Sequence, residues 1–191
     1  MQRIDYYFSV MSPFTYLAGT RLEVLAGIHF YGINYKPMDI ARVFAETGGT
    51  APKDRHWSRQ EYRLQDLRRV AESNEMPINL KPAFWPADPL PASCSLIAAL
   101  DAGFSIGATV HAFVRAVWAE ERNIAHPDIV DAILAENDID KNAIAPFLDG
   151  AEAQYQQNTG DAIESGVFGA PFYLVGEEKF WGQDRLQYLD S

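Results

Sequence analysis

Strand-forming sequence is confined to the two ends of this 191-residue chain, and a long helical stretch separates them. Towards the N-terminus, residues 4–10 and 33–37 are rich in β-branched and aromatic side chains, and residues 14–27 between them show the apolar spacing of a helix. Towards the C-terminus, residues 171–175 and 178–181 have the pattern of a β-hairpin. Any fold for this chain must therefore build its sheet from strands that are distant in the sequence.

The order of these elements predicts an α/β fold. A helix between two strands favours a parallel pair, so the N-terminal unit is β-α-β, and the hairpin followed by a helix over residues 184–189 gives a β-β-α unit. Between the two units, helical spacing recurs in segments that end at Gly, Pro, Asp or Asn. We expect these helices over residues 40–44, 58–73, 92–102, 105–121, 128–136, 140–148 and 150–164.

Composition excludes several classes of function. The net charge of −10 and the pI near 4.8 argue against nucleic-acid binding, which needs clustered Lys and Arg. No segment approaches the roughly 20 apolar residues of a membrane span, and the N-terminus lacks the apolar region of a secretory signal, so we expect a cytoplasmic protein. Cys94 is the single cysteine, which excludes a CxxC redox pair. The histidines and carboxylates do not fall at metal-ligand spacing, so we expect no metal site.

The turn after the first strand is the first candidate site. Ser12 followed by Pro13 fits a helix N-cap with proline at the first helical position. A helix N-terminus stabilises an anion, and thioredoxin-type proteins place a reactive cysteine there. Here Ser12 and Thr15 put hydroxyls where a redox pair would put sulfurs, so a thiolate from another molecule could be held there. Ser12 as a simple helix cap is the alternative.

Two segments near the C-terminus complete the candidate site. Pro171 opens a strand, and a cis bond before it would leave the Ala170 backbone able to pair with an extended, peptide-like ligand. An ordinary trans proline at a strand start is the alternative. The turn at Gly182 then leads to Asp184, which could cap the last helix or accept the ammonium group of a ligand.

Taken together, three motifs resemble the 2-hydroxychromene-2-carboxylate isomerase family: SPFTYLA at residues 12–18, GVFGAPF at 166–172 and FWGQDR at 180–185. This family belongs to the DsbA-like branch of the thioredoxin superfamily and is related to kappa-class glutathione transferases. The resemblance covers nearly the whole chain.

The resemblance implies a fold with two domains. Residues 1–38 and 165–191 would form the thioredoxin-like domain, composed of the β-α-β and β-β-α units, and residues 39–164 the large all-helical insertion.

The resemblance also implies glutathione as cofactor and assigns residues to it. Ser12 matches the catalytic serine that stabilises the glutathione thiolate. The backbone of Ala170, before Pro171, would pair with the cysteinyl part of glutathione. The residues that would hold the γ-glutamyl end are Trp181, Gly182, Gln183 and Asp184.

The helical insertion supplies the implied substrate contacts. Arg59 would bind a substrate carboxylate, with Lys53 as a second basic candidate, and Tyr62 and Asp66 complete a Y-x-x-x-D match. Asp66 would reach glutathione from the partner subunit of a homodimer. Gly49 stands where the family often has an asparagine that could touch the ligand, which bears on the substrate.

The implied activity is that of a glutathione-dependent cis-trans isomerase acting on an aromatic keto-acid similar to 2-hydroxychromene-2-carboxylate. The thiolate would add reversibly to a conjugated double bond, and the single bond formed would allow rotation before elimination. Two alternatives stay open. One is a kappa-like glutathione transferase that conjugates glutathione to an electrophile, and the other is a non-catalytic thioredoxin-fold binding module.

Overall fold

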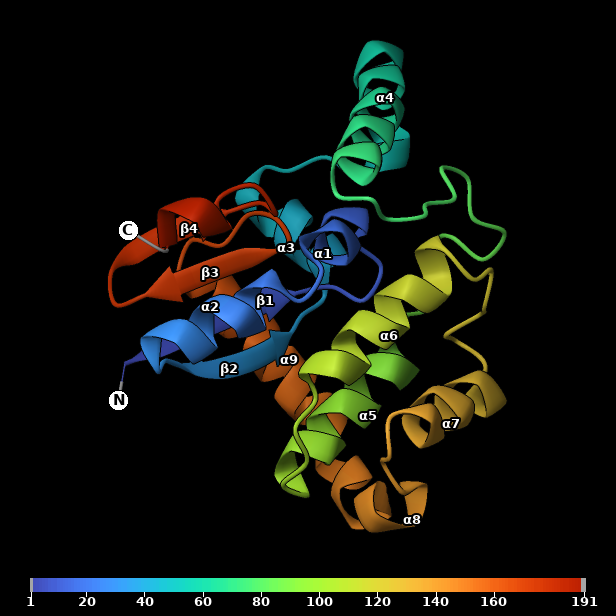
Figure 1. Ribbon diagram of the computed structural model, residues 1–191, viewed down its shortest axis with the longest axis vertical. Helices are drawn as coiled ribbons and strands as arrows, with labels where there is room; N and C mark the ends of the chain where they lie inside the picture. The colour runs from blue at the N-terminus through green and yellow to red at the C-terminus, as the bar shows by residue number, and fades with distance from the viewer. Residues whose placement is uncertain (1, 190–191) are drawn as a thin grey trace.

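The computed structural model describes residues 2–189 and confirms strands at both ends of the chain. The strands β1 (Arg3–Phe8), β2 (Gly32–Pro37), β3 (Phe172–Val175) and β4 (Glu178–Trp181) form a sheet of order β2-β1-β3-β4 (Figure 1). β1 and β2 are parallel, as predicted, whereas β3 is antiparallel to both β1 and β4. β1 therefore joins a strand from each end of the chain.

Helices surround this sheet, which gives the predicted α/β fold with a large helical insertion. They are α1 (Pro13–Ala18), α2 (Arg21–His29), α3 (Ile40–Thr47), α4 (Trp57–Ser73), α5 (Leu90–Asp101), α6 (Gly107–Trp118), α7 (Pro127–Glu136), α8 (Lys141–Ile144), α9 (Leu148–Glu164) and α10 (Leu186–Leu189), with short 3-10 turns η1 (Pro52–Asp54) and η2 (Ala145–Phe147). No helix within residues 2–189 combines the length and the apolar character that crossing a membrane requires.

The helix predicted over residues 14–27 is instead two helices, α1 and α2. Gly19 ends α1 with φ 59°, a backbone conformation that favours glycine. α2 then continues past the predicted end to His29 and closes at Phe30, which adopts a left-handed conformation. The apolar spacing runs on across Gly19, so periodicity alone does not reveal this break.

Two other predicted helices differ in their boundaries. The segment 140–148 contains the short helix α8 and then η2, and α9 begins directly afterwards at Leu148. The last helix begins at Leu186, not at Asp184, because residues 183–184 still belong to the turn that follows β4.

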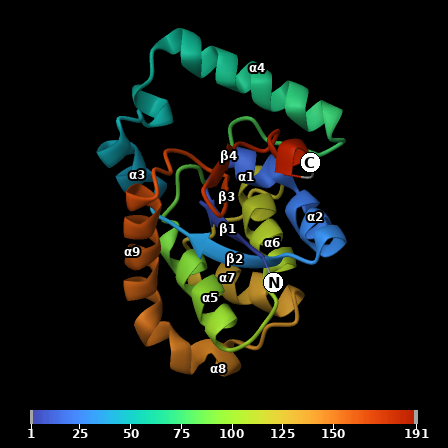
Figure 2. The ribbon, with the colours of Figure 1, turned by 90° about the vertical axis from the view of Figure 1, so that its left-hand side faces the viewer.

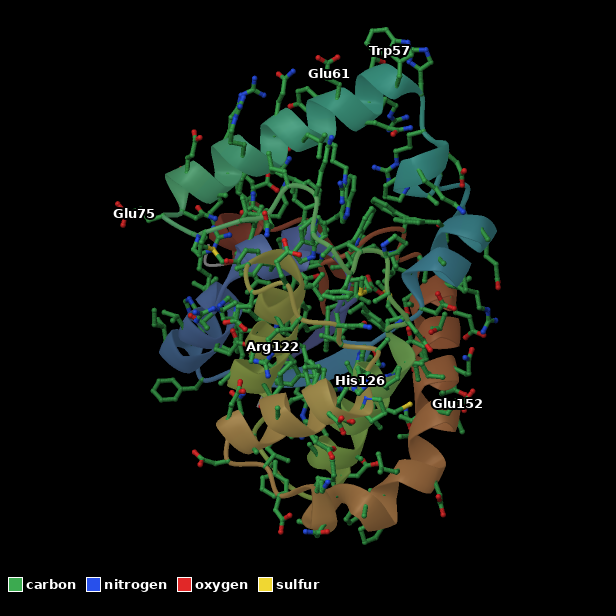
Figure 3. All side chains as sticks on the ribbon, turned by 90° about the vertical axis from the view of Figure 1, so that its right-hand side faces the viewer. Trp57, Glu61, Glu75, Arg122, His126 and Glu152 are labelled. Carbon is green, nitrogen blue, oxygen red and sulfur yellow. The ribbon has the colours of Figure 1, made fainter. Side chains whose placement is uncertain are left out.

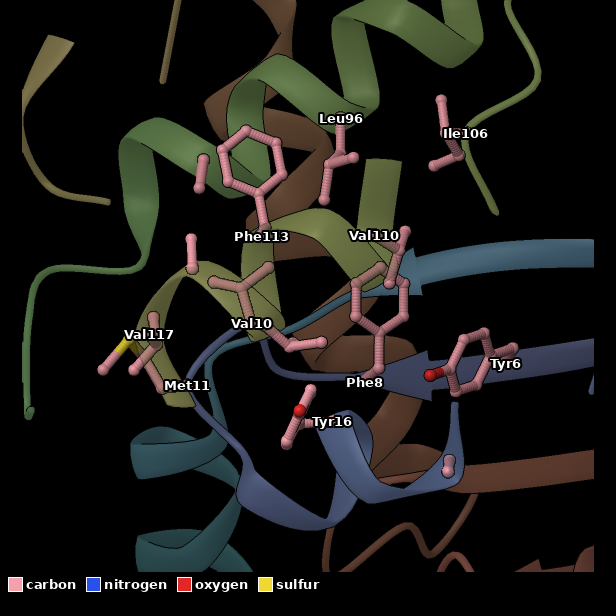
Figure 4. Close-up of a cluster of buried hydrophobic side chains, with 14 of the residues drawn as sticks. Tyr6, Phe8, Val10, Met11, Tyr16, Leu96, Ile106, Val110, Phe113 and Val117 are labelled. Atoms are coloured by element: carbon pink, nitrogen blue, oxygen red, sulfur yellow. The ribbon is translucent and has the colours of Figure 1, made fainter. Parts of the chain in front are cut away.

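Both faces of the central strand β1 are buried. Side chains alternate between the two faces of a strand, and in β1 Tyr6 and Phe8 enter one core cluster while Tyr7 enters another. Phe8 packs in the same cluster as Leu96 of α5 and Phe113 of α6, close to the N-terminal half of α1 (Figure 4). Because sheet and helices share this core, the division into a thioredoxin-like domain and an inserted domain stays a prediction.

α4 crosses over one end of the molecule, above β4 and α1 (Figure 2). It is anchored on one side, where Leu67 and Ala71 are buried. Trp57 and Glu61 lie on its outer side and point away from the rest of the protein (Figure 3). The opposite side of α4 therefore faces the turn after β1, where the sequence predicts the site.

Candidate functional site

Ser12 caps α1 as predicted, and its hydroxyl makes a second contact across the sheet. The backbone N–H of Thr15 donates to Ser12 Oγ at 3.2 Å, with Pro13 at the first helical position. Ser12 Oγ in turn donates to the Ala170 carbonyl oxygen at 3.1 Å. These two residues are 158 positions apart in the sequence, so tertiary structure alone brings them together.

The Ala170–Pro171 peptide bond is cis, one of the two forms that the sequence left open. The Ala170 carbonyl accepts from Ser12, whereas the Ala170 N–H forms no hydrogen bond with residues 2–189. A backbone donor without a protein partner is available to water or to a ligand. The edge beside Pro171 therefore offers a donor to a peptide-like molecule.

The Ser12 hydroxyl has one proton, and in this structure the Ala170 carbonyl accepts it. To stabilise a thiolate, the hydroxyl must turn away from Ala170. The exchange replaces a neutral hydrogen bond, worth about 1 kcal/mol, by a stronger one to a charged group. The switch is thus favourable only when an anion is present.

Thr15 is a second hydroxyl at this turn. Its side chain is 2% exposed, and its Oγ1 has no hydrogen-bond partner among the described residues. Cys94 lies elsewhere, in α5, where burial raises its pKa to about 11. The thiolate of this cysteine is therefore scarce at neutral pH, and the turn itself offers hydroxyls alone.

The turn after β4 is built closely against the cis-proline segment. The Gly182 N–H donates to the Pro171 carbonyl at 3.0 Å, and Gly182 has φ 106°, which favours glycine. The Trp181 indole lies so near the backbone that a Cβ at Gly169 would be 2.3 Å from its Nε1. Trp181 also packs edge-to-face on Phe168, with ring centroids 4.9 Å apart.

The other two residues of this turn differ in how available they are. Gln183 is buried, and its Oε1 accepts from the Arg21 guanidinium at 2.6 Å, so its side chain serves to fix the turn. Asp184 is exposed and pairs with the neighbouring Arg185 at 2.7 Å. Of these two side chains, that of Asp184 is therefore the one accessible to a ligand.

An open pocket of about 270 Å³ lies beside this turn. Its walls combine aromatic side chains with two guanidinium groups; the lining residues are Phe44, Thr47, Gly48, Gly49, Thr50, Arg55, Arg59, Phe168 and Trp181. Gly49 has no room for a side chain, because a Cβ there would be 2.7 Å from the Phe44 ring. A glycine at this position therefore lets the Phe44 ring pack closely against the backbone of the pocket wall.

The pocket contains Arg59 but not Lys53. Lys53 is exposed on η1, and Arg55, which the sequence analysis did not select, lines the pocket in its place. Tyr62 is 60% exposed on α4, and Asp66 on the same helix forms no ion pair or hydrogen bond with the described residues. The described chain therefore does not bring Lys53, Tyr62 or Asp66 into the pocket.

Arg63 is a neighbour of the site that sequence reasoning did not assign to it, and Trp85 connects it to the Ser12 turn. The Trp85 indole N–H donates to the Met11 carbonyl at 3.1 Å, directly before Ser12. The Arg63 guanidinium lies over the Trp85 ring, 5.1 Å from its centroid. The helical spacing of Arg59 and Arg63 was the available signal, since residues four apart share one face of a helix.

Comparisons with known proteins agree with this geometry. Residues 3–191 match the DSBA-like thioredoxin domain family. The 2-hydroxychromene-2-carboxylate isomerase of Pseudomonas sp. (strain C18) is 34% identical over 194 residues, covering 98% of this chain and 88% of that protein. Glutathione S-transferase kappa 1 of Caenorhabditis elegans is 24% identical over 208 residues, covering 99% of this chain and 89% of that protein.

The fold is likewise similar to a solved structure. The structure of a 2-hydroxychromene-2-carboxylate isomerase superposes with a TM-score of 0.79 at 31% sequence identity. The superposition covers 98% of this chain and 92% of that chain. Both helical and sheet regions are therefore shared along nearly the full length.

Proposed function

This chain belongs to the DSBA-like thioredoxin domain family and, within it, to the 2-hydroxychromene-2-carboxylate isomerases, and on this premise we propose that it is a glutathione-dependent cis-trans isomerase of aromatic keto-acids. The observation that carries the proposal is the pocket whose lining combines Arg55 and Arg59 with the Phe168 and Trp181 rings. A flat aromatic acid needs such apolar walls together with cations for its carboxylate.

The residues beside this pocket fit glutathione. The Ala170 N–H is a backbone donor without a protein partner, as an extended peptide requires. The Asp184 carboxylate is exposed and can accept the ammonium of the γ-glutamyl group. Gly182 holds this turn against Pro171, so both contacts would belong to one rigid edge. The kinship to a kappa glutathione transferase supports the same cofactor.

When bound, glutathione would supply the thiolate that adds reversibly to a conjugated double bond. The Ser12 hydroxyl would donate to that sulfur and lower the pKa of the thiol, after turning away from the Ala170 carbonyl. The hydrogen bond from the Thr15 N–H to Ser12 Oγ would hold this hydroxyl oxygen in place beside the bound sulfur. The chain itself needs no reactive cysteine for this chemistry.

The substrate would lie in the pocket beside the sulfur. Arg59 and Arg55 would hold its carboxylate, and Trp181 and Phe168 would flank its ring. The Arg55 guanidinium is oriented by a hydrogen bond to the Thr50 carbonyl at 2.8 Å and by the Phe44 ring, 5.8 Å away. The cation is thus oriented in advance, which reduces the entropy lost on binding.

A cytoplasmic homodimer completes the proposal. Trp57 and Tyr62 on α4 are 68% and 60% exposed, large apolar areas for a helix in contact with solvent. Contact with a second copy would cover them and would bring Asp66 to the partner's glutathione. Analytical ultracentrifugation of the wild type and of Trp57→Ser tests this arrangement, since we expect a dimer that the substitution weakens.

The activity is tested by measuring the isomerisation of 2-hydroxychromene-2-carboxylate by the protein with and without glutathione. We expect isomerisation that requires glutathione and leaves the total thiol concentration unchanged. Arg59→Ala should raise KM by roughly 10-fold, the effect of one charge-assisted hydrogen bond, while Lys53→Ala should match the wild type. Stoichiometric loss of thiol would identify a transferase instead, and glutathione binding without turnover would identify a binding module.

A further inference from the structure

Three arginines form a row towards the site without acidic partners. Arg59 and Arg63 lie one turn apart on α4, and Arg55 precedes them at the same spacing of four residues. Among residues 2–189, no carboxylate lies within ion-pair distance of the three, although the chain carries 26 acidic residues. Some other arginines of the chain are paired, as Arg122 is with Glu136 at 2.9 Å. The row is therefore an unneutralised positive strip.

Arg63 is the most enclosed member of this row. Its guanidinium lies 5.1 Å from the centroid of the Trp85 ring and 5.8 Å from that of Trp118. Contacts with the faces of aromatic rings stabilise the charge but leave the N–H groups at the edge of the guanidinium unused. None of these donors hydrogen-bonds to the described residues. Burial and the charge of Arg55 lower the Arg63 pKa to about 10, so the group is still cationic at neutral pH.

The enclosed end of the row lies at the catalytic turn. Trp85, which packs on Arg63, donates its indole N–H to the Met11 carbonyl, the residue before Ser12. At the other end, Arg55 and Arg59 line the pocket beside Trp181. The strip therefore runs from the pocket towards the Ser12 turn.

We propose that Arg63 binds a carboxylate at the Ser12 end of the site, through the edge of a guanidinium that lies over two neighbouring indole rings. This inference rests on the proposed function and names a contact that function does not include. Two carboxylates could reach this position: that of the aromatic keto-acid, or the glycine carboxylate of glutathione. Both match the planar, two-pronged geometry that a guanidinium offers and an ammonium does not.

The variants must distinguish a role of Arg63 in ligand binding from its role in packing against the indole rings. Arg63→Met keeps an unbranched side chain against the two indole rings and removes the charge. Arg63→Lys keeps the charge and removes the planar fork. Arg68→Met is the matched control, because Arg68 is exposed on the same helix and is remote from the pocket lining. Thermal unfolding of each variant reports the packing contribution by itself.

Calorimetry distinguishes the two sources of the carboxylate. If Arg63 holds the glycine carboxylate, Arg63→Met should weaken glutathione roughly 10- to 100-fold and leave γ-glutamylcysteine, which lacks glycine, unchanged. If Arg63 holds the substrate, both thiols should bind as to the wild type. KM for the keto-acid should then rise by a similar factor, with no change for its neutral methyl ester. In either case Arg63→Lys should lose part of the affected affinity, and Arg68→Met none.

Two further outcomes would refute the role of Arg63 and the proposed function independently of each other. If the wild type binds glutathione and isomerises the keto-acid, and Arg63→Met has wild-type constants for glutathione and keto-acid, then Arg63 only packs and this inference is wrong. If the wild type neither binds glutathione nor turns over the keto-acid, the proposed function itself is wrong. A misfolded Arg63→Met leaves Arg63→Lys to decide, since wild-type constants in that variant would show that the planar fork is not used.

Discussion

Replacing Ser12 by alanine separates the two roles that this residue can have. The substitution removes the hydrogen bonds from the Thr15 N–H and to the Ala170 carbonyl. A lost N-cap costs about 1 kcal/mol, and a second neutral hydrogen bond about as much again at most. For a chain of this size we therefore expect Tm to fall by roughly 2–8 °C.

The effect on a bound thiol should be larger. A hydrogen bond to a charged group contributes about 1.5–3 kcal/mol, which corresponds to a rise of roughly 1–2 units in the pKa of the thiol of bound glutathione. The thiolate fraction at neutral pH, and with it the turnover number, should fall by about 10- to 100-fold. Because the thiolate forms again at higher pH, part of the activity should return as pH rises.

The assay is a titration of the ultraviolet thiolate absorbance of bound glutathione, combined with the pH profile of turnover. Ser12→Gly is the informative partner, since glycine caps a helix almost as well as serine but has no hydroxyl. It should lose turnover like Ser12→Ala and lose less stability. Asp140→Ala removes the cap at the Asn142 N–H of α8 and should lower Tm without changing turnover. Turnover of Ser12→Ala within twofold of the wild type would refute the catalytic role.

Three further predictions follow from packing and burial. Gly169→Ala should displace the Trp181 indole and weaken ligand binding, which calorimetry would detect. In α9, the Cβ introduced by Gly150→Ala would have no atom within 4 Å, so this control should stabilise the protein by about 1 kcal/mol. Thr15→Val removes a buried hydroxyl without a partner, so denaturant unfolding should show a gain of about 1 kcal/mol, and a loss would mean that the hydroxyl is satisfied. Stability should also decrease above about pH 10. Burial raises the pKa of four tyrosines, namely Tyr6, Tyr35, Tyr155 and Tyr173. Above about pH 10 the unfolded chain therefore releases phenol protons that the folded protein retains, which favours unfolding. A free energy of unfolding that stays constant from pH 9 to about pH 11 would contradict this reasoning.

Local signals were sufficient for much of the fold. Strand composition located β1 to β4, and the Ser12-Pro13 pair correctly predicted the start of α1. The Gly19 break was missed, because a left-handed residue interrupts a helix without disturbing its apolar spacing. Such features depend on a few neighbouring residues, so a single sequence can reveal most of them.

The candidate site likewise contains features that local sequence predicts and contacts that only the tertiary structure shows. Residue type and order alone predicted the helix cap at Ser12 and the turn at Gly182, because each needs a particular residue for its own backbone, and left the isomer of the bond before Pro171 open. The choice of Arg55 over Lys53, and the position of Arg63 over Trp85 and Trp118, could not be predicted. Those contacts join segments that lie tens of residues apart, and which side of α4 faces the sheet is decided by the burial of Leu67 and Ala71. The sequence thus determined which chemical groups the protein possesses, whereas the packing of α4 over the sheet decided which of them meet.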